Sequence, residues 1–190
     1  MRFRTLGLAL ALALPWSAQA QDGRVAMADG STEAKIASAM TAAPASISAN
    51  ATVLDWPAAA SGELVLLRPG DNGWTCLPDA LNTDGNDPMC LDETWVTWLK
   101  AYVGGTEPKF NRTGIGYMTA SGGASFSATD PFATAPTADN HWGHDGPHIM
   151  IVVPNPAQLE GLPTSRDGGG PWVMWRGTPY AHVMIPTAGH

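Results

Sequence analysis

The sequence predicts a single α+β domain with a mainly antiparallel sheet and one or two helices packed on one face. Short segments rich in β-branched residues are bounded by proline and glycine, which is typical of strands joined by tight turns. Two longer segments, 31–43 and 92–103, have the periodicity of amphipathic helices. Residues 21–190 suffice for one domain with its own core.

The N-terminal segment 1–20 has the features of a secretory signal peptide. A basic start with Arg2 and Arg4 precedes a short apolar run, and an A-x-A site ends at Ala20. The apolar run is shorter than the about 20 residues that span a bilayer. We therefore expect cleavage after Ala20 and a mature chain in the periplasm or outside the cell, with 21–30 frayed.

The charge of the mature chain restricts its partners. Loss of Arg2 and Arg4 leaves eight basic against 17 acidic residues, a formal charge of −9. An acidic chain with scattered lysines does not suit nucleic acid or an anionic membrane surface. No later segment has the length and hydropathy of a membrane span. The expected partner is a metal ion or an envelope protein.

Cys76 and Cys90 are the only cysteines. In an oxidising compartment they are expected to form an intramolecular disulfide. The closed loop of about 15 residues would stabilise the fold by roughly 3 kcal/mol in the chain-entropy model. A thiolate metal pair is the alternative, but the chain lacks the tight C-x-x-C spacing typical of such sites.

The first half of the mature chain begins with a predicted helix over 31–43. Ser31 or Thr32 can cap this helix, and Pro44 ends it. Two strands and a turn are expected next, at 51–56, 63–68 and 69–73. The acidic loop 79–88 does not follow the order of EF-hand ligands, so we expect solvated turn residues there and no calcium site.

A second helix is predicted over 92–103. Trp95, Trp98 and Tyr102 recur on one face, Asp92 can cap the helix, and the Gly-Gly pair at 104–105 ends it. We expect the two tryptophans in the core. A strand at 114–120, a long irregular loop at 121–140, a helical turn at 155–162 and a strand at 172–176 complete the prediction.

One short pattern occurs twice in the C-terminal third. His148 and Met150 are followed 34 positions later by His182 and Met184, each pair within a predicted strand. Alternation places each His-x-Met pair on one face and aliphatic residues on the other, which we expect to supply a core. A hairpin with a three-residue loop would set Met174 opposite His182.

These pairs suggest a soft-metal site. Residues two apart on a strand lie about 6.6 Å apart on one face, so imidazole and thioether can converge on one ion. This donor combination selects copper, particularly Cu(I). We therefore expect a copper-binding or delivery protein, without turnover, that uses His148, Met150, His182 and Met184, supplemented by Met174. The alternative is plain packing, with methionine as core filler and each histidine bonded to a backbone carbonyl.

A second constellation is His141, His144 and His148. Three imidazoles with an open position activate water on zinc, which would make the chain a zinc-dependent hydrolase. The glycines and proline among them exclude the helix that gives such spacing its meaning. The serines of segment 121–140 lack a G-x-S-x-G elbow, so nucleophilic hydrolysis is not favoured either.

A third hypothesis is a noncatalytic envelope protein that binds a ligand or a protein through aromatic residues. Trp142 lies in a polar, glycine-rich segment, and Trp172, Trp175 and Tyr180 flank the second His-x-Met strand. If exposed, these side chains would suit stacking or a protein–protein hot spot.

Overall fold

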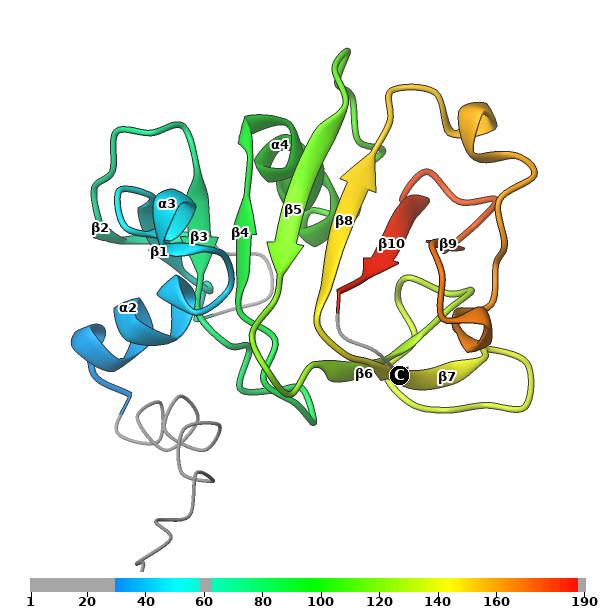
Figure 1. The fold of residues 1–190 in the computed structure, drawn as a ribbon, viewed down its shortest axis with the longest axis horizontal. Helices are drawn as coiled ribbons and strands as arrows, with labels where there is room; N and C mark the ends of the chain where they lie inside the picture. The colour runs from blue at the N-terminus through cyan, green and yellow to red at the C-terminus, as the bar shows by residue number, and fades with distance from the viewer. Residues whose placement is uncertain (1–29, 59–62, 188–190) are drawn as a thin grey trace, which may run out of the picture.

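A mainly antiparallel sheet organises the chain in the computed structural model, which describes residues 30–58 and 63–187 (Figure 1). Within these ranges, eight strands form one sheet in the order β2-β1-β3-β4-β5-β8-β10-β9, and only β1 and β3 pair in parallel. The strands are β1 (Thr52–Asp55), β2 (Val65–Arg68), β3 (Thr75–Leu77), β4 (Met89–Leu91), β5 (Gly114–Met118), β8 (His148–Val152), β9 (Trp172–Met174) and β10 (His182–Pro186). The predicted α+β class is confirmed. The segment 1–20, predicted as a signal peptide, and nearly all of 21–30 lie outside the described residues.

The remaining elements are short. A two-stranded ribbon pairs β6 (Ala124–Ser127) with β7 (Trp142–Asp145). The helices are α2 (Thr32–Met40), α3 (Ala45–Ser48) and α4 (Glu93–Val103), with 3₁₀ turns η1 (Pro156–Leu159) and η2 (Arg166–Gly168). Across 30–58 and 63–187, no helix combines the length and apolar character needed to cross a bilayer.

Both longer helices begin at the predicted caps. The Ser31 hydroxyl accepts from the backbone N–H of Ala34 at the start of α2. At the start of α4, Asp92 accepts from the N–H of Trp95 at 2.8 Å and also from the N–H of Ile115 at 2.7 Å. Asp92 therefore both caps α4 and fastens it to β5.

The two helices lie on opposite faces of the sheet, a difference from the predicted single face (Figure 1). Helix α2 packs its alanines against the side that carries Cys76 and Cys90. Helix α4 packs Trp95 and Trp98 against the side that carries Met150. Strand alternation explains this arrangement, because β3 and β4 present cysteines to one face and leucines to the other.

The disulfide prediction is confirmed. Cys76 lies directly opposite Cys90 on the antiparallel strands β3 and β4, and their sulfurs are bonded. Both residues are fully buried beneath α2. The bond therefore joins two central strands of the sheet.

The His/Met face carries the main core. Met150, Met174 and Met184 belong to the large cluster under α4. The aliphatic face, expected to supply a core, forms only a smaller cluster around Leu159 and Val183. The aromatic side chains Trp95 and Trp98 of α4 belong to the larger cluster and add large apolar surfaces to it.

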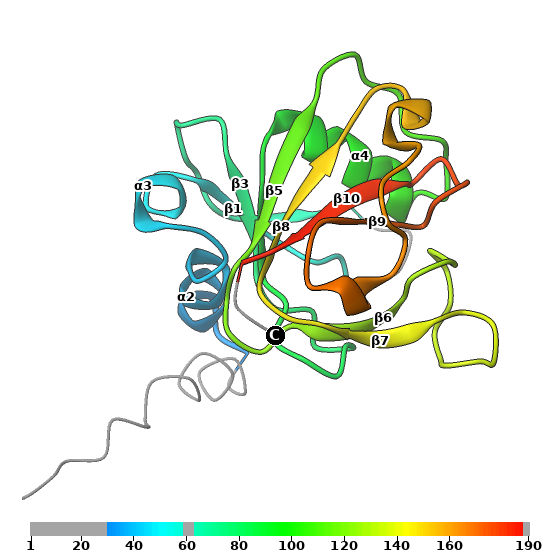
Figure 2. The same ribbon diagram turned by 45° about the vertical axis from the view of Figure 1, so that its right-hand side comes forward.

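Two strands occupy segments predicted to be irregular. β6 lies inside the expected loop 121–140, and β7 overlaps the histidine-rich segment (Figure 2). The backbone at Gly85 lies very close to the backbone just before β6, a contact that the local sequence does not indicate. A Cβ on Gly85 would lie 1.5 Å from the carbonyl oxygen of Gly123. Only glycine fits there.

Candidate ligand-binding cavity

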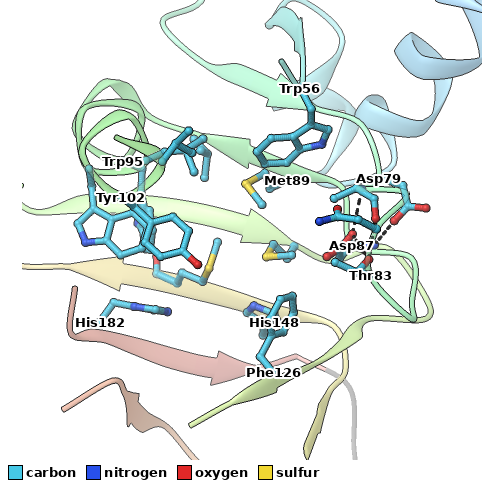
Figure 3. Close-up of a pocket in the computed structure, with 18 of the residues that line it drawn as sticks. Trp56, Asp79, Thr83, Asp87, Met89, Trp95, Tyr102, Phe126, His148 and His182 are labelled. Atoms are coloured by element: carbon cyan, nitrogen blue, oxygen red, sulfur yellow. Dashed lines mark hydrogen bonds between the residues drawn. The ribbon is translucent and has the colours of Figure 1, made fainter. Parts of the chain in front are cut away.

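A cavity of about 680 Å³ lies between α4 and the sheet (Figure 3). One group of lining side chains is aromatic: Trp56, Trp95, Trp98, Tyr102, Phe126 and Trp175. The other group consists of thioethers: Met89, Met118, Met150, Met174 and Met184. The sheet, α4, β6 and the loop 79–83 thus line a mainly apolar space. The lining also includes polar side chains: Lys35, Asp55, Asp79, Asn82, Thr83, Asp87, His148 and His182.

Two buried histidines face this cavity, with 5% of His148 and 2% of His182 exposed. The Nδ1 of His148 lies 2.6 Å from the carbonyl oxygen of Gly146, and the Nδ1 of His182 lies 2.9 Å from that of Tyr180. A carbonyl only accepts, so each Nδ1 carries the proton and each Nε2 carries a lone pair. Burial lowers the pKa of both imidazoles, that of His182 to about 4, which keeps them neutral at pH 7.

The strand register separates the two histidines. Met150 lies directly opposite Met184, while His148 pairs with Pro186 at one end of β10. His182 lies at the other end of β10, so about four residues, or roughly 13 Å, separate the histidines along the strands. Figure 3 shows the two rings apart along the sheet. The structure brings the two thioethers together but does not bring both imidazoles to one ion.

The predicted hairpin register is confirmed, although the connection is longer than three residues. Met174 pairs with His182, and Trp172 pairs with Met184. Trp175 turns the chain after β9 with a φ of 56°. His182 consequently lies among aromatic rings, with the centroid of Trp175 at 5.0 Å and that of Trp95 at 5.3 Å, both edge-on.

A carboxyl pair forms one end of the cavity, which the sequence did not predict. Asp79 is 1% exposed and Asp87 is 4% exposed, so the expectation of solvated turn residues is wrong for these two. The backbone N–H groups of Asp87 and Ala80 donate to Asp79 and Asp87 respectively, and Thr83 contacts Asp87 at 3.2 Å (Figure 3). Their burial depends on non-local packing, such as the N–H of Asp79 donating to Ser38.

A largely buried ion pair joins η2 to β7. The Arg166 guanidinium makes two bonds to the Asp145 carboxylate, at 2.9 and 3.2 Å, and lies over the Trp172 ring at 5.1 Å. A Cβ on Gly143 would lie 2.1 Å from this guanidinium. Gly143 therefore leaves the space through which Arg166 reaches β7.

The structure does not bring His141, His144 and His148 together as a zinc site. His144 is exposed and contacts the carbonyl oxygen of Gly122 at 2.6 Å. His141 is exposed as well, whereas His148 is buried against the cavity. Among the residues that the structure describes, no group of three His, Cys, Asp or Glu side chains could hold a metal ion.

The aromatic residues considered for recognition are mostly buried. Trp172, Trp175 and Tyr180 are no more than 7% exposed, so they form no exposed stacking surface. Trp175 instead lines the cavity, while Trp142 is half-buried on β7. The periodicity that identified Trp95 and Trp98 as core residues gave no sign that they also line a cavity.

The chain matches no protein-family model, and no curated protein or solved structure shows detectable similarity to it.

Proposed function

We propose that the protein binds a small, mainly apolar molecule in the cavity under α4, without chemical turnover. The single observation that carries this proposal is the size and lining of the cavity. At about 680 Å³ it falls within the about 300–1,000 Å³ typical of small-molecule sites, and its walls are aromatic and thioether side chains. Such walls bind apolar surface through the hydrophobic effect and dispersion.

The polar groups around the cavity limit which functional groups the bound ligand can have. The Nε1 of Trp98 is a donor only, and it is buried without a hydrogen-bond partner among the described residues. An acceptor on the ligand, such as a carbonyl or hydroxyl oxygen, would satisfy it. The two imidazoles are neutral, and Lys35 in the cavity lining already pairs with Asp55 at 2.6 Å, so neither offers an uncommitted counter-ion to a charged group on the ligand.

A neutral fluorescent probe, N-phenyl-1-naphthylamine, tests the proposal. We expect saturable binding near one equivalent, with enhanced probe emission and energy transfer from the cavity tryptophans. Met89→Trp places a bulky indole in the cavity and should weaken binding. Leu66→Trp adds the same indole at an exposed position outside the cavity and is the matched control. Unsaturable binding, or equal effects of both variants, would refute the proposal.

We also propose that the chain is exported and cleaved after Ala20. The Cys76–Cys90 disulfide supports an oxidising compartment. N-terminal sequencing of protein recovered outside the cytoplasm should begin at Gln21. Ala18→Arg with Ala20→Arg should block this processing, because the cleavage site requires small residues. Recovery of the full-length wild-type chain from the cytoplasm alone would contradict this.

A further inference from the structure

We infer that the imidazole of His148 and the thioethers of Met118, Met150 and Met184 form a binding site for a soft monovalent metal ion, Cu(I). The site lies in the sheet wall of the same cavity, so its thioethers also face the space proposed for an apolar molecule. It differs from a set built on both His-x-Met pairs, because Met118 replaces His182.

The register of three neighbouring strands assembles these donors. Met118 on β5 lies directly opposite His148 on β8, and Met184 on β10 lies directly opposite Met150. Directly opposed Cα atoms lie about 4.5–5.5 Å apart, and residues two apart on a strand lie about 6.6 Å apart. All four residues line the cavity on the face beneath α4. The four donor side chains therefore start from neighbouring positions on three adjacent strands, on one face of the sheet.

His148 provides the observation that points to a ligand. Its Nε2 is buried, and the described ranges contain no hydrogen-bond partner for it. A buried acceptor without a partner is costly and uncommon in folded proteins. Its Nδ1–H donates to the carbonyl oxygen of Gly146, which fixes the tautomer with the lone pair on Nε2. Metal-binding histidines characteristically have this arrangement.

The donor types select the ion. Thioethers combined with imidazole favour Cu(I) over the hard cations, which prefer carboxylate and carbonyl oxygens. All four donors are neutral, so they do not offset the charge of a divalent ion in an apolar setting. The thiolates of Cys76 and Cys90 are not available as competing ligands, since they form a disulfide.

A second hollow offers a route to this site. His148 and Met184 also line a smaller cavity of about 380 Å³, together with His144, Asp145 and Asp167. Arg166 also lines this cavity and offsets the Asp145 carboxylate, so Asp167 and the exposed His144 are the groups left to attract a cation there.

Competition for Cu(I) tests the site. Cu(I) held by bicinchoninate is titrated with the purified protein under anaerobic conditions, with ascorbate as reductant so that the disulfide is retained. We expect the protein to take up one equivalent. Met118→Leu and Met150→Leu keep the apolar volume but remove a sulfur, and each should weaken Cu(I) binding by about tenfold or more.

Met174→Leu is the matched control. Met174 lines the same cavity but pairs with His182 and is not among the four donors. Its substitution should leave the affinity for Cu(I) unchanged. Separately, copper-edge X-ray absorption of the wild type should show both nitrogen and sulfur ligands. Circular dichroism and the unfolding midpoint establish that each variant is folded. Failure to compete with bicinchoninate, equal losses in all three variants, or an edge spectrum without sulfur would each overturn the inference, whatever the naphthylamine probe shows.

Discussion

The backbone N–H of Asp87 donates to the Asp79 carboxylate at 2.9 Å, and both buried side chains line the same end of the cavity. Burial, together with the neighbouring Asp79 carboxyl, raises the pKa of Asp87 from its ordinary 3.8 to about 7. Two carboxylates so close together cannot both ionise easily, so the pair retains a proton near neutral pH.

This proton makes stability depend on pH. The folded protein holds the proton of Asp87 more tightly than the unfolded chain does, because the folded pKa is about 7 against 3.8. The stabilisation from this carboxyl is therefore complete below pH 3.8 and is lost as the pH rises to about 7. Asp87→Asn should flatten this part of the stability profile, measured by denaturant unfolding across the range.

Asp71→Asn is the control for this prediction, since Asp71 lies in the exposed turn before β3. It should leave the slope between pH 4 and 7 as in the wild type. An Asp87→Asn protein with the wild-type slope would show that this carboxyl is not responsible.

Breaking the Arg166–Asp145 pair should markedly lower the free energy of unfolding. Arg166→Leu leaves the Asp145 carboxylate, whose side chain is 5% exposed, without its guanidinium. Removing one member of a buried pair costs about 3–5 kcal/mol. Arg112→Leu removes the comparable pair with Glu93, whose side chains are 69% and 84% exposed, and should cost only roughly 0–1 kcal/mol. Similar losses in the free energy of unfolding for both variants would contradict the structure.

The disulfide should contribute substantially to stability. Replacing both Cys76 and Cys90 by alanine opens a loop closed across a separation of 14 residues, and should lower the free energy of unfolding by about 3 kcal/mol. Denaturant unfolding measures this difference. A reductant should destabilise the wild type to a similar degree and leave the double variant unchanged. A wild type that is insensitive to reduction would count against a stabilising bond.

Local sequence patterns predicted much of the fold. Asp92 and Ser31 were identified as caps because capping chemistry is local. The pairing of Met174 with His182 was predicted from a three-residue hairpin loop, and the longer connection in the structure keeps the same register. Alternation shows which residues share a face. It does not show which face a distant helix covers, so the His/Met side was not predicted to carry the main core.

The candidate site was predictable only in part. His148, Met150 and Met184 were identified from their spacing, but Met118 belongs to a strand whose register with β8 is not encoded locally. The Asp79 and Asp87 segment has the composition of a solvated turn. Its burial depends on contacts with residues distant in the chain, such as Ser38. Non-local packing decides such positions.

Methyl-¹³C spectra of methionine test the central claim, that the cavity binds a small apolar molecule, most directly. Titration with N-phenyl-1-naphthylamine should shift the methyl signals of the five cavity methionines, which are Met89, Met118, Met150, Met174 and Met184. The signal of Met40 should stay in place, because its sulfur contacts Arg68 away from the cavity. Saturable shifts confined to the cavity methionines are the predicted result. Unshifted cavity signals, or an equal shift of Met40, would contradict it.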